Sequence, residues 1–473
     1  MTLLFLPEII LSLAAAALLC FTLAKTPKTA PFVSGFMLAA AALVLGGCIL
    51  SLYQSGDLFS AGYRIDLFSQ GFKTITAIGL FLTVLFSAEW NAIPPNRQIE
   101  YNLFLVTGAL GMMMMASAVD LLSLFVAIEL SAYSLYLLAA LKPGKRSAES
   151  SVKYLIFGAT TSGAALWGLS LVVGLAGTTS LAVILQNLPA LSAQPAFILG
   201  GALFSLSLIF KLSGFPMHFW APDVYESAST PAVSFIATAS KAAAVSVLIR
   251  ILSFTGASAP LSAAVGVLAF ISMTLGNTVA LVQTDVKRLL AYSSIAQAGY
   301  ILLGLLSGTP QCFSTALFYA FAYVIMNSGA FLVVTLVAKA AHHDNPQISH
   351  FDGLAERSPF LALVLLLSLL SLAGIPPLLG FTGKWILFTS AMEKGHWFLV
   401  LWAVLNSVVS LFYYLTIVKH AYLGKPKDST PLVCSPAMSA AGLAIFAALV
   451  GIGVYPAFFI SFAEKAIVTG LFR

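Results

Sequence analysis

The sequence has very little charge. Of its 473 residues only 8% are Asp, Glu, Lys or Arg, while 60% are hydrophobic, and the mean hydropathy is +0.98. In a soluble globular domain roughly a quarter of the residues are charged. So few charges cannot cover the surface of a water-soluble protein of this length, and the composition therefore excludes a soluble enzyme.

Other classes are excluded by further absences. The four cysteines, Cys20, Cys48, Cys312 and Cys434, are far apart in the sequence and indicate neither a disulfide framework nor a CxxC site. Continuous apolar runs, without alternation, disfavour a transmembrane β-barrel, and 35 Phe with 15 Tyr exclude disorder. No nucleotide-binding loop, nucleophile elbow, or haem or iron–sulfur ligand set is recognisable. The remaining class is an all-α polytopic membrane protein.

Long apolar runs are what the sequence has instead. A transmembrane helix needs about 20 apolar residues, and no basic segment precedes the first run, so no cleavable signal is expected. The segment 177–194 is uncharged and is expected to be an external loop near the membrane interface. Fourteen spans are predicted, at 3–24, 31–52, 72–90, 102–118, 120–141, 152–176, 195–220, 231–254, 259–283, 287–307, 313–340, 359–392, 396–422 and 437–461.

The distribution of Lys and Arg predicts the orientation, because these residues concentrate in cytoplasmic loops. With the N-terminus outside, most of them fall on the inner side, which favours fourteen helices with both termini outside. The inner group is Lys25, Lys28, Arg97, Lys142, Lys145, Arg146, Lys153, Lys287, Arg288, Lys339, Arg357, Lys419, Lys425 and Lys427. The outer group is Arg64, Lys73, Arg250, Lys394, Lys465 and Arg473.

The chain also resembles itself. The tripeptide SGA at 162–164 recurs at 328–330, and LSGFP at 212–216 is matched by LAGIP at 372–376, at nearly the same offset. Such internal repeats are typical of transporters. We expect two five-helix units, helices 4–8 and helices 9–13. The expected divisions are 1–101 for helices 1–3, 102–254 and 255–422 for the two units, and 423–473 for helix 14.

Prolines predict breaks in helices 7 and 12. Pro216 and Pro376 each lack the amide hydrogen of a helical residue, and their rings clash with the carbonyls of Leu212 and Leu372. Carbonyls freed at membrane depth are tolerated only where they face protein or water. The matched positions therefore favour a hydrated polar path beside both breaks, although packing kinks would explain each proline alone.

Four ionisable residues stand out inside the predicted spans, where charge is costly. Glu129 lies about 13 Å into helix 5, Lys211 precedes Pro216, Lys241 lies about 15 Å into helix 8, and Lys384 follows Pro376. Burial shifts an amine toward proton exchange near neutral pH, and a nearby carboxylate opposes that shift. We therefore expect Glu129 and Lys211 to act as a charge switch, Lys241 as a central relay and Lys384 as an exit-side group. The alternative is a set of buried pairs that only fix helix packing.

Two weaker candidates involve histidine. His218 follows Pro216 and could join a proton wire, or it could be a hydrogen-bonded core histidine. The triplet HHD at 342–344 has metal-ligand residue types but no partner at ligand spacing, so a solvated loop is favoured and no metal is expected.

At these residues the chain resembles a known family. The segments FKLSGFPMHFWAPDVY at 210–225, ATASK at 237–241, QTDVKRLLAYSS at 283–294 and LAGIPPLLGFTGK at 372–384 are similar to motifs of the antiporter-like membrane subunits of respiratory complex I, NADH:quinone oxidoreductase. The helix-8 motif lacks the histidine usual in subunits L and M and in Mrp-type antiporters. One departure is Gln297, which stands where some relatives carry a protonatable residue.

The resemblance implies a function. It implies a proton-translocating subunit in the cell inner membrane, with Glu129 and Lys211 as the charge pair, Lys241 as the relay and Lys384 as the exit-side lysine. It also implies that the chain itself binds no cofactor, while partner subunits hold NADH, FMN, iron–sulfur clusters and quinone. The implied partners are protons, the lipid bilayer, antiporter-like subunit M and small subunit K, with no nucleic acid. Alternatives are an Mrp-type cation/proton antiporter subunit, a subunit of a related hydrogenase complex, and a non-transporting scaffold.

Overall fold

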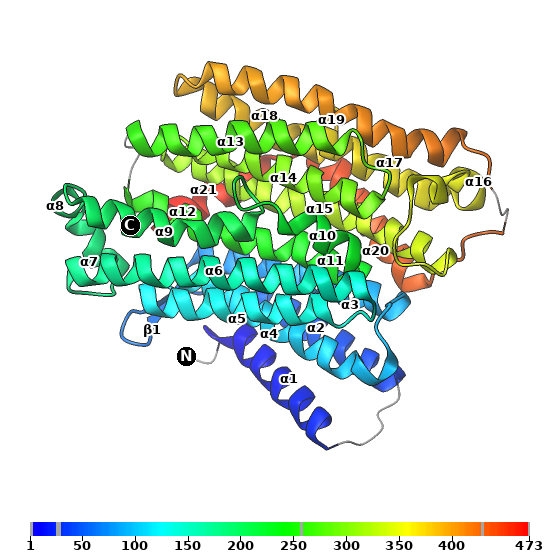
Figure 1. Ribbon diagram of the computed structural model, residues 1–473, viewed down its shortest axis with the longest axis horizontal. Coiled ribbons are helices and arrows are strands. Elements are labelled where there is room, and N and C mark those ends of the chain that lie inside the picture. The colour runs from blue at the N-terminus through cyan, green and yellow to red at the C-terminus, as the bar shows by residue number, and fades with distance from the viewer. Residues whose placement is uncertain (1–2, 25–29, 256–258, 427–429, 472–473) are drawn as a thin grey trace.

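The protein is a bundle of long helices that run side by side between two ends (Figure 1). The computed structural model describes residues 3–24, 30–255, 259–426 and 430–471; Lys25, Lys28, Lys427 and Arg473 of the predicted charge bias lie outside these ranges. The helices of the bundle are α1 (Leu6–Leu23), α2 (Ala30–Ser51), α3 (Leu67–Glu89), α4 (Gln98–Ser117), α5 (Leu121–Ala140), α6 (Lys145–Ala176), α9 (Pro195–Leu212), α10 (Trp220–Ser227), α11 (Thr230–Ala237), α12 (Ala239–Thr255), α13 (Ala259–Ala280), α14 (Val286–Leu305), α15 (Pro310–Ala340), α17 (Pro359–Ala373), α18 (Leu379–Glu393), α19 (Trp397–Leu423), α20 (Pro436–Val454) and α21 (Ala457–Leu471).

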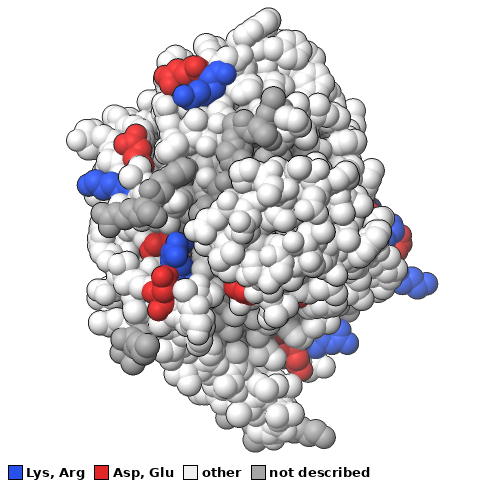
Figure 2. Space-filling view, turned by 90° about the vertical axis from the view of Figure 1, so that its left-hand side faces the viewer, with Lys and Arg blue, Asp and Glu red and all other residues white. Residues whose placement is uncertain are grey.

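The predicted all-α polytopic fold is confirmed. Among the described residues, 12 helices are long and apolar enough to cross a membrane. Together with α14 and the α17–α18 pair, they give the fourteen predicted passes. Both termini lie at the same end of the bundle, on the left in Figure 1, as an even number of passes requires. Figure 2 shows this end, where charged side chains form small separate groups on an otherwise uncharged surface.

Helix starts follow from residues that can satisfy the free amide groups of a first turn. Asp66 accepts from the Ser69 amide before α3, and Asp120 and Asp285 do the same at the starts of α5 and α14. Thr309 and Ser435 cap α15 and α20, each of which begins with a proline. The chain therefore satisfies its own helix ends where loops enter the bundle.

Several predicted boundaries were wrong. The expected external loop 177–194 contains two short helices, α7 (Leu181–Gln186) and α8 (Leu188–Leu191), and an unpredicted hairpin of β1 (Gly56–Leu58) and β2 (Tyr63–Ile65) precedes α3. These are elements of only three to six residues, which hydropathy alone does not resolve. The last span does not end at 461: α20 stops before Pro456 and α21 continues to Leu471.

The two predicted breaks are confirmed. Predicted helix 7 is divided into α9, which stops at Leu212, and α10, which begins at Trp220. Predicted helix 12 is divided into α17, which stops at Ala373, and α18, which begins at Leu379. The peptide bonds before Pro216 and Pro377 are cis. Predicted helix 8 is also interrupted, at Thr238 between α11 and α12. No proline stands there, and no break was predicted.

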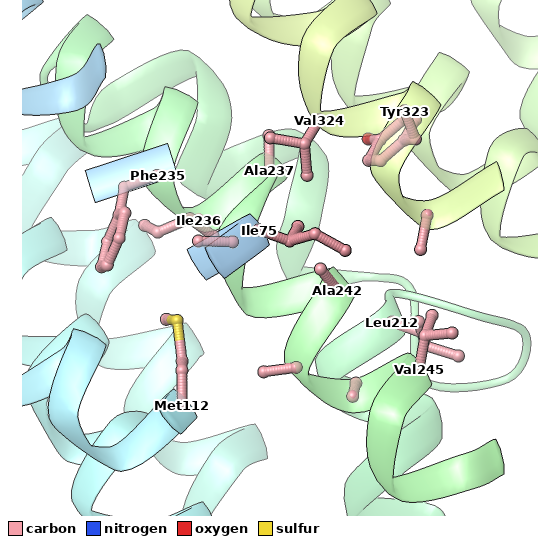
Figure 3. Packing of buried hydrophobic residues seen from close by; sticks show 14 of the residues in the cluster. Ile75, Met112, Leu212, Phe235, Ile236, Ala237, Ala242, Val245, Tyr323 and Val324 are labelled. Carbon is pink, nitrogen blue, oxygen red and sulfur yellow. The ribbon is translucent and has the colours of Figure 1, made fainter. Parts of the chain in front are cut away.

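The helix with this unpredicted break forms the centre of the bundle. In both the Thr230–Ser253 span and α15, 94% of the apolar window is buried. Figure 3 shows Phe235, Ile236 and Val245 of this span among Ile75 of α3 and Met112 of α4, with further side chains from α9 and α15. Polar residues in the middle of this span, such as Lys241, are therefore enclosed by protein.

Two close helix crossings depend on glycine. A Cβ at Gly111 on α4 would lie 2.6 Å from the Ser131 amide nitrogen and 2.9 Å from the Ala127 carbonyl oxygen on α5. Gly276 on α13 faces Ala296 and Tyr292 on α14 in the same way, at 2.5 and 2.7 Å. Small residues allow such backbone approach between membrane helices.

We expect Gly111→Ala to destabilise the protein by about 1–3 kcal/mol, because the added methyl group overlaps backbone that cannot rotate away. The measurement is the thermal unfolding midpoint of the purified protein in detergent. Gly163→Ala on α6 is the matched control, since nothing lies within 4 Å of its Cβ position. Equal midpoints for the two variants would contradict the assignment of this crossing.

Candidate functional site

The first break, between α9 and α10, frees a backbone carbonyl and lies beside Lys211. α9 ends with Ser213 in the left-handed conformation, and the freed Phe210 carbonyl accepts from Trp220 Nε1 at 3.0 Å. Lys211, in the last turn of α9, is 5% exposed, and its Nζ donates to Ser131 Oγ on α5 at 2.9 Å. The break is therefore closed by a side chain from beyond it, and the lysine beside it points into the bundle.

Glu129 and Lys211 do not form a direct ion pair. The Glu129 carboxylate accepts from Ser162 Oγ on α6 at 2.7 Å, whereas Lys211 binds Ser131, two residues further along α5. Positions two apart on a helix face different directions. Glu129 also lines a groove of about 620 Å³ between α1, α4 and α5, so this acid lies at the edge of the bundle.

Lys241 lies just after the unpredicted break in helix 8. It is 1% exposed, and its Nζ donates to the Ser294 carbonyl at 3.0 Å and to Ser294 Oγ at 2.8 Å on α14. The Tyr225 hydroxyl of α10 lies 3.3 Å from Ser294 Oγ. The central amine therefore contacts neutral oxygen atoms that connect it to a second helix.

The second predicted break is held by Lys384 and Gln297. Lys384 Nζ donates to the freed carbonyls of Leu372 and Ala373 at 3.0 and 3.1 Å and to Ser407 Oγ at 2.6 Å. Gln297 Nε2 on α14 donates to the same Leu372 carbonyl at 3.1 Å, and the Tyr319 hydroxyl donates to Gln297 Oε1. Gln297, which departs from the protonatable residue of some relatives, is thus part of the polar lining.

These contacts form one polar path along α14. Ser294 holds Lys241, Gln297 follows one helical turn later, and the Leu372 carbonyl joins Gln297 to Lys384. Lys241 and Lys384 have no carboxylate within 4 Å among the described residues. A buried cation without a counter-ion is costly, so these are positions where exchange of a proton is chemically accessible.

His218 lies in the non-helical segment between α9 and α10. It is 5% exposed, its ring stacks near Phe219 with centroids 4.2 Å apart, and Nδ1 is buried without a hydrogen-bond partner in the described part of the chain. No hydrogen bond joins it to Lys211 among the described contacts. Its part in a proton wire stays a prediction.

The expectation of a solvated loop at 342–344 was wrong for Asp344. Its carboxylate is buried and lies 2.8 Å from Lys142 Nζ and 3.5 Å from the buried Lys287 Nζ, and it accepts from Thr230 Oγ1 at 2.7 Å. Burial alone would raise the pKa of Asp344, but Lys287 and Lys142 lower it below its usual value. No group of three metal-ligand side chains occurs among the described residues.

A second buried ionic cluster, at the end with the termini, was missed by the sequence reasoning. Lys73 and Arg250 were expected as outer charges but lie buried within α3 and α12. Lys73 Nζ pairs with Glu8 Oε1 at 2.6 Å, which also accepts from the Tyr63 hydroxyl, and Arg250 lies 3.4 Å from Asp66. The available signal was the position of Glu8 and Lys73 inside or beside apolar runs.

The fold and the site together indicate the class of protein, a membrane protein that moves ions. Broken helices around buried ionisable residues are typical of membrane proteins that move ions.

The comparisons with known proteins are specific. Residues 118–410 match the model of the NADH:quinone oxidoreductase/Mrp antiporter transmembrane family. The chain is 42% identical over 467 residues, 98% of each chain, to NADH-quinone oxidoreductase subunit N 2 of Syntrophobacter fumaroxidans. It is similar to a chain of respiratory complex I from Thermus thermophilus with bound aureothin (TM-score 0.83, 32% identity, 97% of this chain and 99% of that chain). A chain of the Mrp complex from Dietzia sp. DQ12-45-1b shares the fold (TM-score 0.88, 20% identity, 100% and 98% covered). The chain belongs to the NADH:quinone oxidoreductase/Mrp antiporter family, on the branch of relatives named subunit N.

We expect Asp344→Asn to lower the free energy of unfolding at pH 7 by about 3 kcal/mol, because Lys287 would remain buried without its carboxylate. A lowered pKa in the folded protein stabilises it above the usual Asp pKa, and this contribution disappears as the pH falls through the folded value. The difference between variant and wild type should therefore shrink below about pH 4.

The measurement is the thermal unfolding midpoint in detergent at a series of pH values. Asp57→Asn is the control, because its pair with Arg64 is exposed and should contribute little. An Asp344→Asn loss as small as that of the control would contradict the buried pairing.

Proposed function

We propose that the chain translocates protons as the subunit N component of an NADH:quinone oxidoreductase. The observation that carries this proposal is the path from Lys241 through Ser294 and Gln297 to Lys384, which joins two amines that lack counter-ions. The Leu372 carbonyl only accepts hydrogen bonds, from both Gln297 and Lys384, so the polar groups along this path would pass a proton by holding water between the two amines. Redox energy released in other subunits would reach this chain as changes of charge.

The proposed roles follow the polar contacts. Lys211 and Glu129 act as the charge switch, through movement of side chains that now bind Ser131 and Ser162. Lys241 relays the proton at the centre, and Lys384 exchanges it with one side. His218 is placed in the broken segment beside Lys211 and is the candidate for an additional relay.

Two inverted five-helix units, helices 4–8 and 9–13, are part of the proposal. The glycine crossings support it, because Gly111 faces Ala127 and Ser131 as Gly276 faces Tyr292 and Ala296, at one constant offset. The residues that cap the second helix of each unit support it as well. Asp120 forms an isolated β-bridge with Ser180, which follows the third helix of one unit. Asp285 forms an isolated β-bridge with Gln347, which follows the third helix of the other.

The location and partners follow from the same assignment. The chain is a multi-pass inner-membrane protein that assembles with other complex I subunits. We infer that antiporter-like subunit M and small subunit K are its neighbours, and that NADH, FMN, iron–sulfur clusters and quinone are bound by partner subunits. Both termini would face the periplasm, because Lys142, Lys145, Arg146 and Arg288 cluster at the opposite end.

A scaffold role and an Mrp-type antiporter role make different demands on the lysines. In a scaffold the buried amines would only fix packing, and a side chain of similar shape without a proton would suffice. In a cation/proton antiporter, transport would proceed without NADH. Proton movement driven by NADH oxidation therefore separates the three functions.

We expect Lys241→Met to reduce NADH-driven proton translocation roughly tenfold or more, because methionine carries no exchangeable proton. The measurement is acidification of proteoliposomes that contain the whole complex, normalised to NADH oxidised, with subunit content checked by electrophoresis. Lys145→Met, an exposed lysine at the start of α6, is the control. Normal translocation by a fully assembled Lys241→Met complex would rule the proposal out in favour of a scaffold.

Ser294→Ala tests the path itself. Loss of the hydroxyl removes one of the two oxygen atoms on Lys241 Nζ and the link to Tyr225, so translocation should fall roughly three- to tenfold. Ser246→Ala on α12 is the matched control, since Ser246 Oγ donates only to the carbonyl of Ala243 on its own helix. Equal translocation by both serine variants would show that protons bypass Ser294.

A further inference from the structure

A second groove lies away from the lysine path, between α13 and the first turn of α19. It has a volume of about 900 Å³ and is lined from Ser262 to Ile271 along α13, which is about 14 Å of helix. Because α13 and α19 bound it and Val267 and Phe398 on its walls are more than half exposed, the groove opens on the side of the bundle.

The groove is apolar along its length and polar at one end. Phe270, Val267 and Phe398 line the long part, and Lys394 and His396 lie where α18 turns into α19. Lys394 is exposed and has no ion-pair partner among the described residues. The adjacent carboxylate of Glu393 accepts from Gln311 Nε2 at 3.1 Å. Among the described residues, Lys394 at the polar end therefore forms no ion pair of its own.

An unsatisfied hydroxyl lies in the same groove. Ser307, after the end of α14, is 8% exposed, and its Oγ is buried without a hydrogen-bond partner among the described residues. Buried hydroxyls are seldom left unpaired. This oxygen indicates that a ligand with hydrogen-bonding groups completes the polar end.

The depth of the polar end matches the membrane interface. Trp397, beside His396 at the start of α19, is 64% exposed, and aromatic side chains of this kind concentrate at the level of lipid headgroups. From there the groove follows α13 toward the bilayer centre. A polar head at the interface and an apolar tail along the groove are the two parts of a phospholipid.

We propose that this groove binds one anionic phospholipid from the leaflet at the end with the termini. Its phosphate lies by Lys394 and His396, Ser307 Oγ hydrogen-bonds the headgroup or ester region, and an acyl chain lies along α13 over Gly266 and Val267. The exposed Lys394, which forms no ion pair among the described residues, favours an anionic over a zwitterionic headgroup. A transmembrane helix of another subunit would fill the apolar part but would leave Lys394 and Ser307 without partners.

The test uses the whole complex in lipid nanodiscs made of equal parts phosphatidylglycerol and phosphatidylcholine. Native mass spectrometry of the released chain counts the lipids that stay bound. The wild-type chain should retain one phosphatidylglycerol. Ala263→Trp, on the exposed wall of the groove, should lose it, whereas Ala264→Trp, exposed one position further and outside the groove, should retain it.

The headgroup contact is tested separately. Lys394→Gln should lower the preference for phosphatidylglycerol about fivefold, and Lys465→Gln, an exposed lysine elsewhere, should not change it. Retention of lipid by Ala263→Trp equal to that of Ala264→Trp would overturn the proposal, and so would equal retention of the two lipids by the wild type. Cross-linking of Ala263→Cys to another subunit, with no label from a photoreactive phosphatidylglycerol, would show that a protein segment fills the groove.

Discussion

The structure depends on one constraint: inside a membrane, a polar group freed from its helix must find a partner within the protein. The break between α9 and α10 frees the carbonyl of Phe210, which accepts from Trp220 Nε1. The break between α17 and α18 frees the carbonyls of Leu372 and Ala373. Lys384 donates to both of these, and Gln297 donates to the carbonyl of Leu372. The second break thus both requires a buried donor and positions it. In the proposed function the same amine that satisfies the backbone also carries the proton, so structure and transport share one set of contacts.

A rigid frame surrounds these contacts. Ion pairs close both ends of the bundle, with Lys73–Glu8 at the end with the termini and Lys287–Asp344 at the other. Glycine crossings at Gly111 and Gly276 fix the helices that carry Ser131 and Ser294. Buried charges that are paired with an opposite charge fix a geometry. Lys241 and Lys384 instead contact neutral groups, and Lys384 Nζ also lies 4.4 Å from the centre of the Tyr300 ring. In the proposed function these two amines change their charge. Buried charges with counter-ions therefore belong to the rigid frame, whereas the two buried amines without counter-ions belong to the proposed path.

Much of the fold and part of the candidate site were predictable from the sequence, because hydropathy, proline and buried charge are strong signals in a membrane protein. The passes, two breaks and three buried lysines followed from such patterns. The partners did not, because Ser131 and Ser294 are ordinary helix serines until the fold brings Lys211 and Lys241 to them. The break at Thr238 has no proline to mark it. Asp344 was expected in a solvated loop, because its lysine partners, which bury it, come from distant segments.

The position of Glu129, at the edge of the bundle and away from the path of Lys241 and Lys384, determines how a change of charge would reach Lys211 in the proposed function. Glu129 and Ser131 face different directions on α5, so the carboxylate that binds Ser162 at the edge and the hydroxyl that holds Lys211 inside belong to one rigid helix. In a medium of low dielectric constant, charges act over longer distances than in water. A change of charge beside Glu129, in the groove along α1, α4 and α5, would therefore be felt at Lys211 without contact between the two side chains. The edge of the subunit is where a neighbouring subunit can deliver such a change.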